Sequence, residues 1–201
     1  MSLNNNFRNS NYNRILAKNY SLTYCGKMLG VYDSTGYNKF QYPIYNSPNF
    51  PQNDCTNFIS QALFAGGKQM TGVSYTSFGS WFCHTKSHTN LSACSLTWRS
   101  ASHFRHYWIN KVKLYKEIPW TNAYYQNDFE ENIWNLLDVS DVIQFAKDYG
   151  TPYHTLIVTD KQLNPNKDIL VSSHSINRCN SSLFDLIKLK KSLIIIYHFD
   201  N

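Results

Sequence analysis

The first third of the chain carries hydrophobic residues at the three- and four-residue spacing of helices. This spacing predicts one helix over residues 12–29 and a second over residues 55–65. Gly66 and Gly67 directly follow the second pattern, and glycine commonly ends a helix. Tyr, Asn, Pro and Gly dominate the 25 residues between the two helices, so residues 30–54 are expected to form a loop.

The middle of the chain gives a weaker pattern. Residues 68–96 are rich in Gly, Ser and Thr and show no clear period. Ser100 or Ser102 is a candidate cap for a helix that continues to residue 109, because serine side chains accept hydrogen bonds from free N–H groups at a helix start. Residues 128–137 predict a short helix or turn.

Beyond residue 139 the pattern changes to short runs rich in β-branched and aromatic residues. Four such runs predict strands, at residues 142–145, 154–159, 168–174 and 193–199. Helices followed by a cluster of strands favour an α+β fold with an antiparallel sheet. With 201 residues and no internal repeat, residues 1–201 are expected to form a single domain.

Composition and charge narrow the classes of protein. The net charge is +6, but Lys and Arg are scattered and no nucleic-acid-binding motif is present, so no nucleic-acid partner is expected. No run of about 18 apolar residues predicts a membrane span, and the first residues lack the apolar core of a signal peptide. Five cysteines, an odd number at irregular spacing, favour a reducing compartment. We therefore expect a cytoplasmic protein.

Cys55 is the strongest candidate for chemistry. It begins the helix predicted over residues 55–65, inside the polar run NDCTN at residues 53–57. Free N–H groups and partial positive charge at a helix start favour a thiolate, which is the nucleophilic form of cysteine. A single helical cysteine is more often a small buried apolar residue. The polar surroundings favour the nucleophile, and we expect alkylation of Cys55 below the usual thiol titration near pH 8.5.

The run NDCTNFISQALFAGG, at residues 53–67, resembles the signature of the bacterial putative amidase domain family. Further similar segments are Trp98 with Ser100, DVIQF at 141–145, HTLIV at 154–158, and Ser173 with His174. Ser140 departs from the family, which usually has glycine at that turn. That family is a branch of the papain-like and NlpC/P60-like cysteine peptidases. The resemblance implies a papain-like fold, with the nucleophile helix packed on the sheet, and thiol chemistry without a cofactor.

Cysteine acyl transfer also needs a base and a group that orients it. His154 opens the second predicted strand and is the candidate base. If residues 154–159 and 169–174 pair antiparallel, with Thr159 near Ile169, then His154 lies near His174 on the same face of the sheet. His174 is therefore the candidate third member. Asn177, just beyond the strand, is the reserve candidate, and a slip of one residue in register would break the pairing.

Supporting roles fall to neighbouring residues. Asn53 and the backbone N–H of Cys55 are candidate donors to an oxyanion, although a helix-capping role for Asn53 is equally well supported. Asp54 is expected to cap the helix or fix the loop. Trp81 and Trp98 are candidates for the walls of the substrate cleft, but core packing is the commoner role of such residues. The cysteines and histidines between residues 83 and 94 lack the paired spacing of zinc sites, so no metal is expected.

Three functions fit these features. The first is a hydrolase, in which Cys55 forms an acyl-enzyme from a peptide-type amide and water releases it. The second is a cytoplasmic acyltransferase that takes an acyl group from a thioester or amide donor, such as one on a carrier protein, and passes it to an amine. The third is a non-catalytic binding module, which the presence of both Cys55 and His154 disfavours.

Overall fold

The computed structural model describes residues 12–31, 33–45, 54–147 and 149–200. Its helices are α1 Arg14–Tyr24, α2 Cys55–Ala65, α3 Leu96–Arg99, α4 Ala101–Trp108, α5 Gln126–Asn132 and α6 Leu183–Lys190, with single 3₁₀ turns at Leu91–Ala93, Trp120–Ala123 and Trp134–Leu136. Its strands are β1 Leu114–Ile118, β2 Val142–Ala146, β3 Pro152–Gln162, β4 Asp168–Ser173, β5 Arg178–Ser182 and β6 Leu193–His198. The mixed α+β class predicted from the sequence is confirmed.

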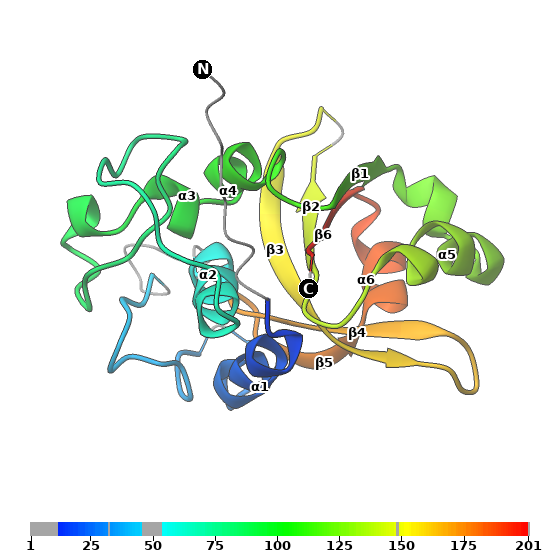
Figure 1. Cartoon of the computed structure of the whole chain (residues 1–201). Helices are drawn as coiled ribbons and strands as arrows, with labels where there is room; N and C mark the ends of the chain where they lie inside the picture. Colours follow the sequence, from blue (N-terminus) through cyan, green and yellow to red (C-terminus); the bar gives the residue numbers. More distant parts are fainter. Residues whose placement is uncertain (1–11, 32, 46–53, 148, 201) are drawn as a thin grey trace, which may run out of the picture.

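All six strands belong to one antiparallel sheet in the order β1-β6-β2-β3-β4-β5. The sheet separates two helical layers, with α1 to α4 on one side and α5 and α6 on the other (Figure 1). Successive residues of a strand point to opposite faces. Thus Ile157 packs into the apolar cluster that includes α2, whereas Leu156 and Val158 pack into the cluster that includes α5 and α6. The site is built on the first of these faces.

Helix α2 lies across the sheet as a fully buried element. Nine consecutive residues, from Cys55 to Leu63, are buried, which explains why its sequence is apolar on most sides. The helix ends where the two glycines predict. Gly67 has φ +96°, a conformation that other residues rarely adopt, and a side chain on Gly66 would meet the ring of Tyr12 at 2.5 Å.

Helix α1 ends at Tyr24, five residues before the predicted end of the first helix. Gly26 has φ +94°, and a Cβ there would lie 2.4 Å from Nδ2 of Asn177, so only glycine fits. Cys25, beside it, forms a disulfide with Cys179 of β5. The irregular cysteine spacing gave no indication of this bond, which ties the end of α1 to an edge strand.

Ser140 adopts φ +69°, the left-handed region that favours glycine. Its hydroxyl donates to the carbonyl of Arg14 at 2.6 Å, and its carbonyl accepts from the Tyr12 hydroxyl at 2.9 Å. The turn before β2 therefore has a backbone conformation that favours glycine, and contacts with Tyr12 and Arg14 hold the serine in it.

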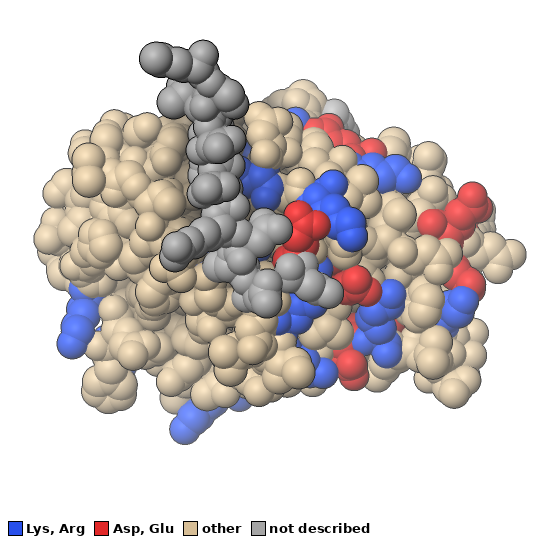
Figure 2. Space-filling model, viewed as in Figure 1, with Lys and Arg blue, Asp and Glu red and all other residues tan. Residues whose placement is uncertain are grey.

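Charged side chains are unevenly distributed over the surface. Figure 2 shows them concentrated over the half of the molecule that carries α5 and α6, whereas the half over α3 and the chain before it is almost uncharged. In the part of the chain that the structure describes, no helix is long and apolar enough to cross a membrane.

Candidate active site

Cys55 is the first residue of α2 and is 4% exposed. Its side chain contributes to the wall of a cavity of about 440 Å³ on the α1–α4 side of the sheet. The cavity is lined by Tyr45, Cys55, Thr56, Leu96, Arg99, Ser100, Ala101, Ser102, Pro152 and Tyr153. The lining comes from the start of α2, the α3–α4 junction and the start of β3. A small molecule in this cavity would have access to a single thiol.

A buried chain of hydrogen bonds fixes the start of α2 to the sheet. The hydroxyls of Thr56 and Thr155 lie 2.8 Å apart. Gln144 on β2 donates to the Thr155 hydroxyl at 3.0 Å and to the carbonyl of Ala101 at 2.9 Å. The Tyr197 hydroxyl on β6 donates to Gln144 at 2.6 Å. Because satisfied buried networks are rigid, this chain sets the position of Cys55 relative to β3.

The environment of the Cys55 sulfur sets its protonation. Burial raises the pKa of the Cys55 thiol. The backbone N–H of Thr155 and the hydroxyl of Thr56, 3.8 Å from the sulfur, favour the thiolate, while the Asp54 carboxylate disfavours it. The net direction is upward. The expectation of a lowered pKa from the helix start alone was therefore wrong for this structure, because desolvation outweighs the nearby donors.

His154 lies on β3 opposite Phe145 of β2 and is buried. Along the strand, the His154 side chain points to the same face of the sheet as that of Leu156. The side chain of the next residue, Thr155, points to the face that carries α2. Burial, followed by the charges of Arg178 and Lys190, lowers the pKa of His154 to about 3, so the ring is neutral near pH 7. Its Nε2 atom has no hydrogen-bond partner among the described residues. An unsatisfied buried nitrogen is uncommon and calls for an explanation.

Cys55 approaches the strand of His154 only through the backbone of Thr155. The N–H that faces the Cys55 sulfur belongs to the residue that directly follows His154. No hydrogen bond between the described side chains joins the Cys55 sulfur to the His154 ring. The elements α2 and β3 are thus in contact, but the His154 side chain points to the other face of the sheet from Thr155 and does not line the cavity. Both groups are neutral at physiological pH.

The predicted register between β3 and β4 was wrong. Ile169 pairs with Lys161 rather than with Thr159, and Ser172 pairs with Ile157. Thr159 lies in a bulge, where its hydroxyl donates to the side-chain oxygen of Asn180 at 2.7 Å. A bulge adds an unpaired residue and shifts all pairs beyond it. The alternation of hydrophobic residues does not reveal such an insertion.

His174 is held away from His154 by its own partners. Its Nδ1 lies 2.6 Å from Oδ2 of Asp54, and its Nε2 lies 2.6 Å from the carbonyl oxygen of Tyr24. Both partners are acceptors, so both bonds form only when the ring carries two protons. The rings of Tyr37 and Phe58 stack on its two faces, with centroids at 3.4 and 3.9 Å. His174 is fully enclosed and is bonded to Asp54.

Asp54 connects this pair to the nucleophile. Its Oδ1 accepts from the backbone N–H of Tyr45 at 2.8 Å and from the side chain of Asn57 at 3.0 Å. Its own N–H donates to the Ser175 hydroxyl at 2.9 Å. The side chain does not cap α2, and fixing the loop is the part of the prediction that matches the structure. Asp54 holds three chain segments directly before Cys55.

Asn177 also belongs to the scaffold. It is fully buried, accepts from the Tyr37 hydroxyl and donates to the carbonyl of Met28 at 3.1 Å. Its backbone exchanges hydrogen bonds with Gly30 and Val31. These contacts fix the loop after α1 rather than a catalytic imidazole. Asn53, the candidate oxyanion donor, lies outside the described residues.

Trp81 and Trp98 are core residues that do not line the cavity. Both are fully buried, and their ring centroids lie 4.6 Å apart. The Trp98 ring nitrogen donates to Asn57 at 2.9 Å, and the Trp81 ring nitrogen donates to Ser60 at 3.0 Å. They position the polar residues of α2. Core packing, the commoner role of such residues, is therefore the role observed for both.

The cysteine and histidine residues before α3 form part of a small β-structure. Cys83 and Cys94 face each other in an isolated antiparallel bridge, and both are free thiols. Across the described ranges, no group of three or more Cys, His, Asp or Glu side chains has an arrangement suited to a metal ion.

Sequence reasoning assigned no role to Thr56, Thr155, Gln144 and Arg99. Thr155 and Gln144 interrupt otherwise apolar strands, and a polar residue in such a strand signals a buried hydrogen bond. Arg99 gave no signal, because a single arginine after a tryptophan has no distinctive pattern.

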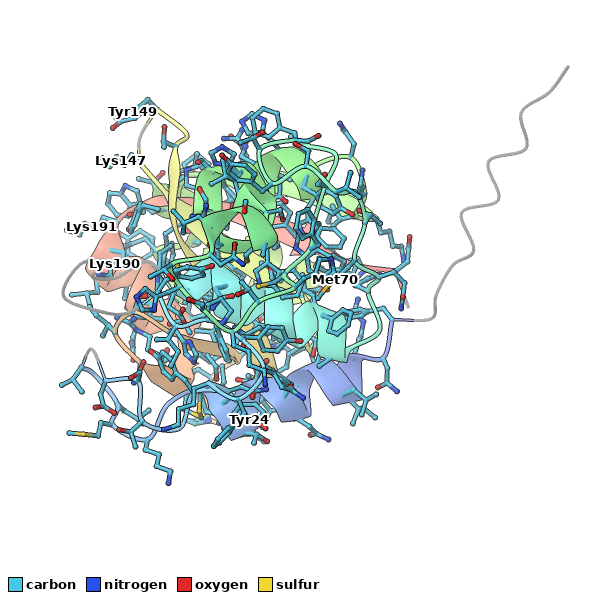
Figure 3. The ribbon with its side chains drawn as sticks, turned by 90° about the vertical axis from the view of Figure 1, so that its left-hand side faces the viewer. Tyr24, Met70, Lys147, Tyr149, Lys190 and Lys191 are labelled. Carbon is cyan, nitrogen blue, oxygen red and sulfur yellow. A yellow bond between two sulfur atoms is a disulfide. The ribbon has the colours of Figure 1, made fainter. Side chains whose placement is uncertain are left out.

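Figure 3 looks onto α2 from the side of the α1–α4 layer, with Tyr24 at the end of α1 and Met70 beyond α2.

Comparison with known proteins supports the resemblance drawn from the sequence. The model of the family described as "Putative amidase domain" matches residues 11–197, which is nearly the whole chain. No curated protein and no solved structure gave a significant match. The matched region contains Cys55, the cavity and the whole sheet except His198, the last residue of β6. The chain therefore belongs to the putative amidase domain family.

Proposed function

We propose that this chain is a cysteine amidase in which Cys55 forms an acyl-enzyme from a peptide-type amide. The observation that carries this proposal is the placement of Cys55 in the cavity wall, with the N–H of Thr155 facing its sulfur. This contact joins the helix of the nucleophile to the strand of His154. Family membership supports amidase-type chemistry.

The proposed reaction starts from a neutral pair. Because burial raises the pKa of the Cys55 thiol and lowers that of His154, the resting site holds a thiol and an imidazole. We propose that the sulfur attacks the amide carbonyl carbon while its proton passes to Nε2 of His154, which has no partner among the described residues, a transfer that requires the ring to turn from the face of Leu156 to the face of Thr155. The same proton then goes to the leaving amine as the C–N bond breaks. An acyl thioester on Cys55 remains.

Water completes the cycle. His154 takes a proton from water, the resulting hydroxide attacks the thioester carbonyl, and the proton returns to the Cys55 sulfur as the carboxylic acid leaves. We assign the developing oxyanion to the backbone N–H of Cys55 and the side chain of Asn53. In this proposal His174 is a positioning residue that acts through Asp54, and Asn177 holds the loop beside it.

Aminolysis is the alternative fate of the acyl-enzyme. Cys55 is 4% exposed, and limited access of water favours an amine that binds in the cavity. The enzyme would then be an acyltransferase, with a thioester or amide donor and an amine acceptor. We also propose that the α2–β3 arrangement is papain-like, since those enzymes pack the helix of the cysteine against the strand of the histidine.

The cytoplasmic location stays a prediction. The disulfide between Cys25 and Cys179 weighs against it, because such bonds are uncommon in a reducing compartment. The test is to acidify cells directly, alkylate the protein and count its free thiols, which distinguishes the two compartments. Five alkylated cysteines support the cytoplasm, and three support an oxidising compartment.

The first test is alkylation of Cys55 by iodoacetamide against pH, followed by peptide mass mapping. Cys83, which is also buried, gives the matched comparison.

Peptide p-nitroanilides and acyl thioesters are then incubated with and without glycinamide. We expect Cys55→Ser to lower turnover by at least about 10³-fold and Cys83→Ser to leave it within about twofold.

Detection of the intact acyl-enzyme on the Cys55 peptide by mass spectrometry supports the mechanism. A glycinamide adduct as the main product identifies an acyltransferase, and free acid identifies a hydrolase. Retained turnover in well-folded Cys55→Ser would sink the proposal and favour a binding module.

A further inference from the structure

The cavity at Cys55 contains one fixed positive charge. Arg99 ends α3 and lines the cavity together with Cys55. Its Nε donates to the carbonyl oxygen of Cys94 at 3.3 Å, and its guanidinium carbon lies 5.7 Å from the centroid of the Tyr45 ring. These two contacts hold the stem and one side of the group. Among the described residues, no hydrogen bond or ion pair uses its terminal nitrogens.

No acidic side chain lines the cavity to balance this charge. The carboxylate of Asp54, the residue before Cys55, is already bonded by His174, Asn57 and the N–H of Tyr45. Outside the described ranges the sequence contains a single acidic residue, Asp148. An arginine in a partly closed cavity without a counter-ion is a site for an anion from solution.

The remaining polar groups of the cavity donate hydrogen bonds. The Tyr45 hydroxyl is buried and lies near the Cys94 thiol without a hydrogen bond of ordinary geometry. Burial raises the pKa of Tyr45, so this hydroxyl keeps its proton. The hydroxyls of Ser100 and Ser102 lie 3.3 Å apart on the same wall. One cation and the hydroxyls of Ser100 and Ser102 form an environment complementary to a carboxylate.

The charge of Arg99 acts on its surroundings. Burial, then His106 and then Arg99 lower the pKa of His103, whose Nδ1 lies 3.0 Å from the Ser100 hydroxyl. A neighbouring imidazole is thus held neutral partly by the guanidinium.

We propose that the substrate carries a carboxylate, which Arg99 binds in the same cavity in which Cys55 attacks the acyl carbonyl. This inference rests on the proposed function and adds the class of substrate. A planar guanidinium pairs with a carboxylate through two parallel hydrogen bonds, which orients the ligand as well as holding it. The reacting carbonyl is thereby set at a fixed distance from the charged end of the substrate.

The test uses small alkylating probes that contain the carboxylate. N-iodoacetylglycine, N-iodoacetyl-β-alanine and N-iodoacetyl-γ-aminobutyrate place it at increasing distance from the reactive carbon, and the corresponding primary amides are neutral controls. Rates at Cys55 are divided by rates with glutathione. We expect one chain length to react at least about tenfold faster as the acid than as the amide.

Variants assign the preference to one residue. Arg99→Gln is expected to remove the preference for the acid, and Arg99→Lys to keep part of it, because lysine retains charge without the planar pair of donors. Arg105→Gln is the matched control. Arg105 is an arginine of α4 that is paired with Glu117 and does not line the cavity, and its loss changes net charge equally. Thermal melting checks the fold of each variant.

A second measurement uses the unaltered protein, so that a poorly folded variant does not decide the outcome. N-acetyl-β-alanine is expected to protect Cys55 from iodoacetamide at concentrations at which its amide does not. The probe N-iodoacetyl-phosphoethanolamine tests phosphate as the anion. A stronger preference for this probe than for any carboxylate overturns the carboxylate assignment.

Equal reactivity of acids and amides at every length, unchanged in Arg99→Gln, overturns the inference. If Cys55 still alkylates and turns over amides, the proposed function survives that result. If no probe alkylates Cys55 and no amide is turned over, both proposals fail together.

Discussion

Two buried histidines, His154 on β3 and His174 directly after the neighbouring strand β4, have opposite surroundings. The ring of His174 has an acceptor at each nitrogen and an aromatic ring on each face. His154 has an unpartnered Nε2 and two cations, Arg178 and Lys190, that disfavour its charged form. Both ring nitrogens of His174 have hydrogen-bond partners, whereas Nε2 of His154 has none among the described residues.

This difference separates a structural histidine from a candidate catalytic one. Burying a polar atom without a hydrogen bond costs about 1–3 kcal/mol, so a fold keeps such an atom where another function depends on it. A nitrogen that is free in the resting protein is able to accept a proton from a nucleophile. A nitrogen already bonded to a carbonyl oxygen, as in His174, is not.

The largest expected effect is on activity at His154. His154→Gln should lower kcat/KM by about 10²- to 10⁴-fold, because the proton of Cys55 loses its acceptor. Stability at pH 7 should change by no more than about 1 kcal/mol, since Nε2 makes no bond that the variant could lose. Steady-state kinetics and urea unfolding measure the two quantities. Unchanged kcat/KM would remove His154 from the mechanism.

The next effect is on stability at His174. His174→Gln removes the partner of the buried Asp54 carboxylate, and breaking a buried pair in this way costs about 3–5 kcal/mol. Urea unfolding at pH 7 gives the loss. Activity per folded molecule should fall less than in His154→Gln, because His174 acts only by holding Asp54.

A double variant isolates the charge of this pair. Asp54→Asn keeps an oxygen for the N–H of Tyr45 and for Asn57 while removing the charge. Combined with His174→Gln, it should recover at least about 1 kcal/mol relative to the sum of the single losses. Strict additivity of the two losses would show that no charge interaction joins these residues.

The smallest effect is a dependence of stability on pH. The pKa of His154 is about 3 in the folded protein against a usual value of 6.5. Below pH 6.5 the unfolded chain binds a proton that the folded protein does not, so stability is complete above pH 6.5 and falls as the pH decreases toward 3. At pH 5 the loss is about 2 kcal/mol.

His154→Gln lacks this titration and should therefore lose about 2 kcal/mol less than the unaltered chain between pH 7 and pH 5. Urea unfolding at both pH values checks it. Identical losses in the two proteins would mean that His154 titrates normally in the folded state.

Elements with strong local signals were predicted well. The helix predicted at residues 55–65 matches α2 residue for residue, because an apolar sequence and two glycines define it locally. The four predicted strands all occur. Strands β1 and β5 were missed, since their sequences LYKEI and RCNSS lie at the sheet edges and lack apolar alternation. Helix α6 was not predicted from the sequence.

The site was predicted in part for the same reason. Cys55 at the start of α2 and His154 at a strand could be chosen from residue type and local pattern. The partner of His174 could not, because it depended on a pairing register that the bulge at Thr159 changes. The expected low pKa of Cys55 considered the helix and omitted burial, which depends on residues far away in the chain.

The sequence by itself determined the family, the α+β class and the helix that carries Cys55, because these depend on residues close together in the chain. Tertiary structure alone decided which histidine is satisfied by Asp54, which cysteines form the disulfide and which arginine reaches the cavity. Each of these is a contact between residues far apart in the chain, and its energy depends on burial and on distances that no local pattern contains.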